Sequence, residues 1–347
     1  MTSARPITIV GGGLAGLTLG IALRQHAVPV TLFEAGSYPR HRVCGEFICG
    51  SGIDVLRGLG LYAKFVAAGA VEARSAAFCE EVRTYRPKAL PQAALCLSRH
   101  TMDRLLADEF RGLGGELRQR ERFTGSQYPA GVVRATGRRI ETRPKRVKWI
   151  GLKAHALGAR LGADLEMHFL RGGYVGLCRL AGGVVNASGL FAVQGPVPQL
   201  ASHWRDFLRG PAGSALHERL AGAEFVDESF CAVSGLNLRP ARAEKASECC
   251  VGDALTMIPP VTGNGMSMAF ESAAWAAEPL AAYSRGERTW DESRIAVARR
   301  CDTGFARRLR WARWLQWLLL HRGSRGALLA VGDRCDWLWR AWFHQTR

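Results

Sequence analysis

The fold is decided by one stretch near the start of the chain, Pro6-Ile-Thr-Ile-Val-Gly11-Gly12-Gly13-Leu14-Ala15-Gly16-Leu17. Its β-branched run predicts a buried strand, and the glycines lead directly into a predicted helix over 14–26. The glycines at 11, 13 and 16 fit the pattern G-x-G-x-x-G. In that pattern the first permits a tight turn, the second lets backbone approach a pyrophosphate, and the third lets the helix pack on the strand.

A second predicted strand, Val30-Thr-Leu-Phe, ends at Glu34. This is the spacing of about 20 residues at which an acid binds a ribose hydroxyl. The phosphates of such a ligand lie at the positive N-terminus of the helix, which here begins with Leu14 and Ala15. The first third of the chain therefore predicts a dinucleotide site.

A second glycine motif lies far along the chain, in Gly252-Asp253-Ala254 followed by Pro260 and by Gly263-Asn264-Gly265-Met266. It resembles the second FAD fingerprint of the p-hydroxybenzoate hydroxylase superfamily. The resemblance implies that FAD is the dinucleotide, that Asp253 accepts hydrogen bonds from the ribityl chain, and that Pro260 and residues 263–266 lie beside the isoalloxazine ring. A helix dipole behind the Gly-x-Gly turn would favour negative charge on the reduced flavin.

A loop follows the second strand and contains Pro39-Arg-His-Arg42-Val-Cys44-Gly45-Glu46. It is similar to the loop that passes the flavin ring in the geranylgeranyl reductase branch of the same superfamily. The resemblance implies that Arg42 and Cys44 are active-site residues, and a neighbouring arginine is expected to lower the pKa of the Cys44 thiol. The alternative is a surface loop with a buried cysteine.

The segment Leu97-Ser98-Arg99-His-Thr101-Met102-Asp103 predicts a helix that Ser98 or Thr101 caps and that ends near Phe110. It is similar to a superfamily segment whose arginine contacts FAD, which implies that role for Arg99; a plain surface arginine is the alternative. The superfamily string Gly-Ala-Asp-Gly-x-x-Ser is missing. Its counterpart here is the predicted strand and turn at 132–139, and the usual mode of NADPH docking is therefore in question.

Residues 148–190 predict a meander of antiparallel strands with turns at Gly172-Gly173 and Ala181-Gly182-Gly183. Strand alternation places His168 on one face with Asp164 and Glu166. His168 is a candidate general base on the pocket side, and a histidine satisfied elsewhere in the fold is the alternative.

The formal net charge of +17 is unevenly distributed. Residues 294–347 hold twelve Arg against three Asp, and six of the ten Trp. Helices are predicted over 291–320 and 326–343. This region is interpreted either as core packing with a solvated arginine face or as a surface that contacts a membrane or shields a greasy substrate. No nucleic-acid-binding motif accompanies the charge.

The ten cysteines show no repeated metal-type spacing, and no metal site is predicted. No signal peptide and no apolar run of transmembrane length is visible, so reduced thiols in a cytoplasmic, possibly membrane-associated, enzyme are expected.

Together these motifs predict an α/β protein in which a Rossmann-like FAD domain is interleaved with an antiparallel-sheet substrate domain. The FAD domain is assigned to 1–70, 95–140 and 240–290, the sheet domain to 71–94 and 141–239, and a helical C-terminus to 291–347.

The resemblance implies an FAD-dependent oxidoreductase. We favour a monooxygenase of secondary metabolism that uses NAD(P)H and O2 to hydroxylate a lipophilic aromatic or polyketide-like molecule. Reduction of a prenyl or alkene double bond is the first alternative, and a flavin-binding protein without turnover the second. Halogenation is excluded because the Trp-x-Trp-x-Ile-Pro element of flavin-dependent halogenases is absent: the Trp337-Leu-Trp339 pair continues Arg-Ala-Trp.

Overall fold

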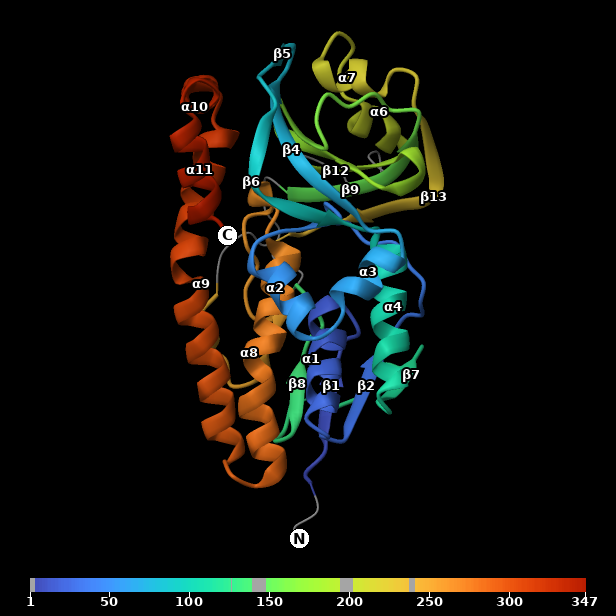
Figure 1. The fold of residues 1–347 in the computed structure, drawn as a ribbon, viewed down its shortest axis with the longest axis vertical. Helices are drawn as coiled ribbons and strands as arrows, with labels where there is room; N and C mark the ends of the chain where they lie inside the picture. The colour runs from blue at the N-terminus through green and yellow to red at the C-terminus, as the bar shows by residue number, and fades with distance from the viewer. Residues whose placement is uncertain (1–3, 126, 139–147, 194–201, 237–240) are drawn as a thin grey trace.

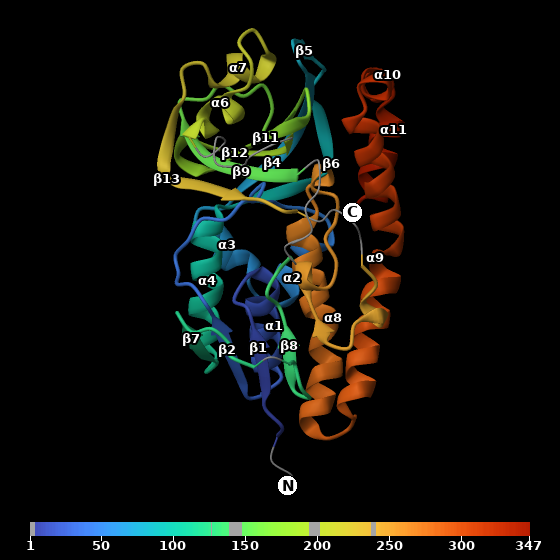
Figure 2. The same ribbon diagram turned by 180° about the vertical axis from the view of Figure 1, so that it is seen from behind.

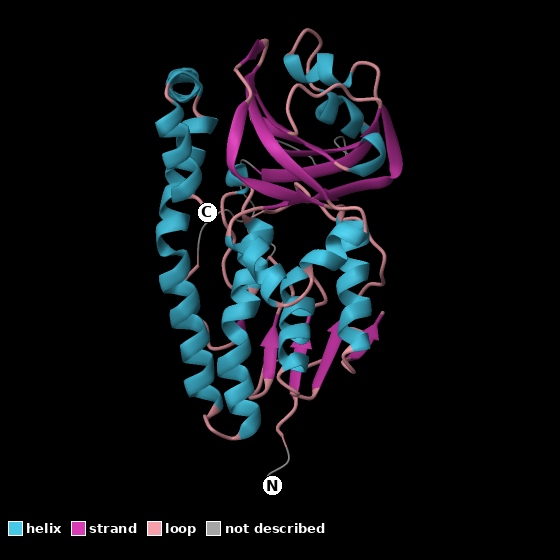
Figure 3. Cartoon of the chain, in the orientation of Figure 1, coloured by secondary structure: helices cyan, strands magenta, loops and turns pink. Residues whose placement is uncertain are grey.

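A computed structural model of the chain describes residues 4–125, 127–138, 148–193, 202–236 and 241–347. Parts of predicted segments that fall on 139–147, 194–201 or 237–240 lie outside the described residues. The molecule is elongated and has a parallel sheet at one end and a curled, mostly antiparallel sheet at the other, with long C-terminal helices along one side (Figure 1, Figure 3). The predicted fold class is confirmed.

The parallel sheet, which we call sheet A, has the strand order β14-β8-β1-β2-β7. Its strands are β1 Ile7–Val10, β2 Val30–Glu34, β7 Glu116–Gln119, β8 Val132–Arg134 and β14 Cys249–Cys250. All pair in parallel. The central strand is covered on both faces, as is usual in a parallel sheet, since Ile9 and Val10 point to opposite faces and both are buried. Because β14 pairs with β8, the second glycine motif joins the sheet that carries the first.

The helices of this end are α1 Leu14–Gln25, α2 Ser51–Gly58, α3 Tyr62–Ala67, α4 Arg99–Gly112 and α8 Gly265–Arg285. Helix α1 contacts both α4 and α8. The predicted cap of α4 is confirmed, since Ser98 Oγ accepts a hydrogen bond from the Thr101 N–H. Gly60, at φ +70°, separates α2 from α3.

The second sheet, sheet B, has the order β13-β9-β12-β11-β10-β4-β6-β3, with β5 paired to β4. Its strands are β3 Phe47–Ile48, β4 Val71–Glu80, β5 Arg83–Thr84, β6 Lys88–Cys96, β9 Lys148–Leu157, β10 Leu165–Leu170, β11 Gly173–Arg179, β12 Val184–Val193 and β13 Glu224–Val233. Helices α6 Trp204–Arg209 and α7 Ala215–Leu220 cover its outer face (Figure 2). Strands β10, β11 and β12 form the predicted antiparallel meander, but β9 pairs with β12 and not with β10. Strand β3 ties the Cys44 loop to the edge of this sheet.

The C-terminal helices are α9 Trp290–Leu320, α10 Arg322–Arg334 and α11 Asp336–Gln345. Helix α9 runs beside α8 and on towards sheet B, where α10 and α11 turn back towards the junction of the two sheets (Figure 1, Figure 2). The single helix expected over 326–343 is wrong, because Cys335 has the extended conformation φ −114°, ψ 94°. Among the described residues, no helix is both long and apolar enough to cross a membrane.

The strands of sheet A and β3 fall in the ranges assigned to the FAD domain, and the remaining strands of sheet B lie almost wholly in those of the substrate domain. The domain boundaries themselves stay a prediction.

Candidate active site

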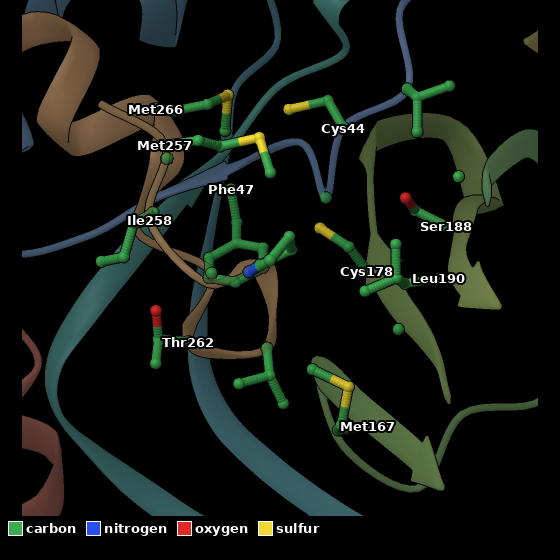
Figure 4. Close-up of a pocket in the computed structure, with 18 of the residues that line it drawn as sticks. Cys44, Phe47, Met167, Cys178, Ser188, Leu190, Met257, Ile258, Thr262 and Met266 are labelled. Carbon is green, nitrogen blue, oxygen red and sulfur yellow. The ribbon is translucent and has the colours of Figure 1, made fainter. Parts of the chain in front are cut away.

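A cavity of about 630 Å³ lies where the two sheets meet and extends to α11. It is lined by both glycine motifs, by the Cys44 loop and by one face of sheet B. Figure 4 shows the part of the lining that includes Cys44, Met266 and Met167. The predicted cofactor residues that line it are Gly11, Gly13, Leu14, Ala15, Glu34, Arg42, Arg99, Asp253, Pro260, Gly263, Gly265 and Met266. Segments more than 200 residues apart in the sequence therefore share one cavity.

Each glycine of the first motif occupies a place where the absence of a side chain matters for a different reason. Gly11 has φ +108°, and a Cβ there would overlap the carbonyl oxygen of Ala135. A Cβ on Gly16 would overlap the Gly11 carbonyl oxygen, so helix and turn pack too closely for a side chain. At Gly13 a Cβ would meet nothing within 4 Å. Gly13 thus keeps a stretch of cavity wall free of side chain, which is the cradle that a pyrophosphate needs.

The N-terminus of α1 opens onto this cradle. Gly13 is its N-cap, no side chain caps it, and no acidic residue lies in its first turn. Leu14 and Ala15 line the cavity with the first residues of the helix. Uncapped N–H groups and the helix dipole favour an anion at this place.

Glu34 ends β2 and is 6% exposed. Its carboxylate accepts hydrogen bonds from the N–H groups of Gly12 (2.8 Å) and Gly36 (2.7 Å) and pairs with Arg40 (2.5 Å). Burial alone would raise the pKa of Glu34, but the hydrogen bond and charge of Arg40 and the two backbone donors together lower it to about 2. The group is ionised and can only accept hydrogen bonds, as a partner of ribose hydroxyls must.

Asp253 lies in the short helical turn Gly252–Ala254 directly after β14 and lines the cavity. Burial raises the pKa of its carboxyl, and the charges of Arg138 and Arg99 act in the opposite direction. Arg138 also lines the cavity. The sequence analysis singled out Asp253 but missed Arg138, because its position shows only once β8 is paired between β1 and β14.

The second glycine turn leads into α8. Gly263 has φ +66°, and a Cβ there would overlap the ring of Phe47. Gly265 is open to the cavity, with the nearest atom to a Cβ being Ile258 Cγ2 at 4.0 Å. Asn264 is fully buried and does not line the cavity. Its side chain accepts a hydrogen bond from the Cys49 thiol (3.1 Å) and donates to the Thr346 carbonyl, so it holds the turn in place instead.

The Cys44 loop passes between the two halves of the cavity, and the thiols of Cys44 and of Cys178 on β11 are directed into it (Figure 4). Burial raises the pKa of Cys44, while the charge of Arg99 acts against this. The expectation that Arg42 lowers this pKa is therefore wrong: the neighbouring cation is Arg99, and burial outweighs it. Cys44 is a neutral thiol at neutral pH, and the side chain of Arg42 is exposed at the cavity rim.

Arg99 is the first residue of α4 and lines the cavity. The contact with FAD that the resemblance implies stays a prediction. The Arg99 guanidinium forms a bidentate pair with the fully buried Asp103, at 2.6 and 2.8 Å. The pair fixes Arg99 in the wall and balances its charge.

His168 does not line the cavity, and its placement on the pocket side is wrong. The alternation of β10 turns Leu165 and Met167 to the cavity, so His168 points to the opposite face. There its Nε2 lies 2.7 Å from Glu166, which also pairs with Arg219 of α7 at 3.0 Å. This buried network fastens α7 to the sheet.

The part of the cavity beyond the Cys44 loop is apolar. Sheet B contributes Phe78, Leu90, Met167, Tyr174 and Leu190, and the C-terminal helices contribute Leu315, Leu319, Leu328, Leu329, Trp339, Trp342 and Phe343. Trp314, Trp317 and Trp337 are 46%, 57% and 71% exposed, whereas Trp339 and Trp342 line the cavity. Leu315, Leu319 and Leu329 also belong to a buried hydrophobic cluster, so core packing accounts for part of this region. Contact with a membrane or with an apolar substrate stays a prediction.

A buried cluster behind the Cys44 loop was missed from the sequence. Glu46 is fully buried at φ +61°. Its carboxylate lies 2.7 Å from His155 Nε2 and 3.5 Å from Lys153 Nζ, and it accepts the Arg99 N–H at 2.8 Å. These contacts stabilise a backbone conformation that a residue other than glycine seldom adopts, and so fix the loop. The sequence does not reveal the cluster because its members come from three separate segments of the chain.

Comparison with known proteins agrees with this geometry. Residues 5–148 match the family model of the FAD binding domain. The flavin-dependent brominase Bmp2 has a TM-score of 0.73 at 17% identity, over 96% of this chain and 94% of that one. PqsL of Pseudomonas aeruginosa, in complex with 2-aminobenzoylacetate, has a TM-score of 0.68 at 17% identity, over 94% and 99%. A flavoprotein/dehydrogenase of Cytophaga hutchinsonii has a TM-score of 0.73 at 14% identity, over 94% of this chain and 88% of that one. No match was found among curated protein sequences.

The family match shows that residues 5–148 hold the FAD binding domain that the sequence analysis predicted. The similar solved structures share less than 25% identity with this chain and agree with it in fold. The observed cradle, the uncapped helix end and the ionised Glu34 fit an FAD molecule, so the residues present agree with the cofactor that the domain implies.

Proposed function

We propose that this protein hydroxylates a lipophilic aromatic or polyketide-like molecule. It has an FAD-binding domain and the fold of the FAD-dependent group A monooxygenase superfamily, which supports the proposal. NAD(P)H would supply the electrons and O2 the oxygen atom. The observation that carries the proposal is the single cavity: a polar half built from both glycine motifs continues into an apolar half walled by sheet B and by α9–α11.

The chain's own residues have separable tasks in this proposal. Glu34 binds the adenosine ribose, the wall at Gly13 and the N-terminus of α1 hold the pyrophosphate, and Asp253 binds the ribityl chain. When bound, the flavin supplies the redox chemistry. The apolar wall excludes water from the substrate, and the neutral Cys44 thiol and the backbone of Gly45 face the reacting region.

Alkene reduction is the second candidate, and one observation favours it. The Arg42-Val-Cys44-Gly45 segment, which resembles the loop of prenyl reductases, does line the cavity. Halogenation is not proposed: the halogenases among the similar folds share less than 25% identity with this chain, and the sequence lacks the Trp-x-Trp-x-Ile-Pro element.

Product analysis under 18-oxygen gas separates the two candidates. The reduced holoprotein is incubated with a panel of lipophilic phenols and prenyl compounds, and products are examined by mass spectrometry. Label in a product supports hydroxylation. A product that gains two hydrogens and no label contradicts it and supports the reductase.

Two further assignments are also proposals. The exposed Trp314 and Trp317 lie on α9 near Arg310 and Arg313, which are exposed as well, and we propose that this face contacts an anionic membrane. A cytoplasmic location, expected from the sequence, stays a prediction.

A further inference from the structure

Arg347 brings a guanidinium into the cavity from the end of the C-terminal region. Its Nη1 donates a hydrogen bond to the Thr262 carbonyl at 2.8 Å, and its Cζ lies 4.7 Å from the centre of the Phe343 ring. The preceding residue, Thr346, accepts a hydrogen bond from Asn264. Residues 346 and 347 therefore bind directly to the turn that leads into α8.

Among the described residues, no Asp or Glu side chain forms an ion pair with this guanidinium. The groups that act on it electrostatically are the Cys49 thiol and the like charge of Arg308, which is itself paired with Glu271 at 2.7 Å. The Nε of Arg347 is buried and without a hydrogen-bond partner. The two arginines that are buried as whole residues, Arg308 and Arg325, are paired with Glu271 and Glu80. A partly buried guanidinium without a carboxylate partner is stabilised when a ligand provides the anion.

The position of Arg347 indicates which anion that is. Its contacts are to Thr262 and, through Thr346, to Asn264, which flank the Gly263 turn expected to follow the isoalloxazine ring. The N-terminus of α8 begins at the same turn, and no side chain caps it. Two positive features thus converge on one end of the cavity, where the flavin gains negative charge when it is reduced.

We infer that Arg347 is an electrostatic positioning residue that stabilises the reduced, anionic form of the bound flavin relative to the oxidised form. The inference rests on the proposed FAD site. It gives the C-terminal region a role in setting the redox potential of the flavin, in addition to its role as a wall of the apolar part of the cavity.

The test compares full-length wild type with R347Q, R347M and R347K, each loaded with FAD. The flavin midpoint potential is measured by equilibration with a reference dye, and the affinity for oxidised FAD by fluorescence. The control is R340Q, because Arg340 lies seven residues before Arg347, in α11, and is exposed.

R347Q and R347M are expected to bind oxidised FAD within about threefold of wild type and to lose at least tenfold in their preference for reduced FAD. For a two-electron couple this is a fall of about 30 mV in midpoint potential. R347K, which keeps the charge, should retain most of the wild-type potential, and R340Q all of it.

A wild-type potential in FAD-loaded R347Q or R347M would overturn the inference while leaving the FAD site intact. Failure of both neutral variants to fold would also overturn it, because Arg347 would then be structural. A wild-type chain that takes up no FAD would instead contradict the proposed function.

Discussion

Glu34 shows how one side chain connects stability with cofactor binding. Its pKa is about 2, against an ordinary value of 4.5, because Arg40 and two backbone N–H groups bind the ionised form. In the folded protein the same carboxylate is held at the mouth of the glycine turn by the Gly12 N–H. The contacts that fold this corner therefore also orient the acid for a ribose.

The pH dependence of stability follows from this lowered pKa. A depressed pKa stabilises the fold above the unfolded-state value, and that contribution is lost as the pH falls from about 4.5 towards 2. The full difference is about 3 kcal/mol. In urea unfolding between pH 3 and 7, E34Q should be less stable than wild type above pH 5, with a gap that narrows below pH 4.5. A gap that stays constant down to pH 3 would contradict the account.

Gly13 is the most direct residue-scale test of the cradle. We expect G13V to fold and to lose FAD, because its side chain would occupy the wall that the pyrophosphate approaches. The matched control is G222V: a Cβ on Gly222 also meets nothing within 4 Å, and this residue is exposed and remote from the cavity. Bound flavin per protein is the measurement, and full occupancy in folded G13V would refute the site.

The glycines and Glu34 were predictable because their spacing along the chain is set by a strand, a turn and a helix. Arg40, Asp103 and Lys153 were not, since each acquires its role from a partner that the fold supplies. The error about the pKa of Cys44 has the same origin: the sequence shows the neighbouring Arg42, whereas burial and Arg99 act in the fold.

At the scale of elements, the pairing of α10 with α11 holds the apolar wall in place. A Cβ on Gly332 of α10 would lie 2.7 Å from the ring of Trp342, which lines the cavity. The helix break at Cys335 allows the two helices to fold back, and no sequence period marks it. The spacing of apolar residues predicts α9 because that helix is long. The alternation of side chains along β10 shows which residues share a face with His168, but it does not show which face meets a ligand.

We expect G332V to displace Trp342 and to destabilise the protein by about 1–3 kcal/mol, the usual cost of overpacking. G323V is the control, since Gly323 lies in the same helix and a Cβ there meets nothing within 4 Å. Urea unfolding measures the difference, and FAD occupancy should be unchanged in both. Equal stability of the two variants would mean that Trp342 does not pack on Gly332.

At the scale of the whole molecule, eight of the twelve arginines of residues 294–347 are exposed, while much of the apolar surface of this region faces the core and cavity. Helix α9 buries Val297, Phe305 and Leu315. The region is therefore part of the folded body, and any membrane contact has to come from its exposed face.

The membrane proposal predicts that the protein floats with anionic liposomes at low salt and is released at high salt. Each basic residue near an anionic surface contributes about 1 kcal/mol, and exposed Trp adds apolar burial. The double variant W314S/W317S should bind more weakly, while W337S, on a different helix, serves as the comparison. Intact protein that stays with the soluble fraction at low salt would end the proposal.

The central claim is that the bound flavin is a working redox centre, and anaerobic addition of NADPH or NADH to the FAD-loaded protein tests it most directly. The account predicts that the flavin absorbance bleaches and that it returns when air is admitted. A flavin that is bound in full and stays oxidised with both nucleotides would contradict the enzyme assignment and would favour a flavin-binding protein without turnover.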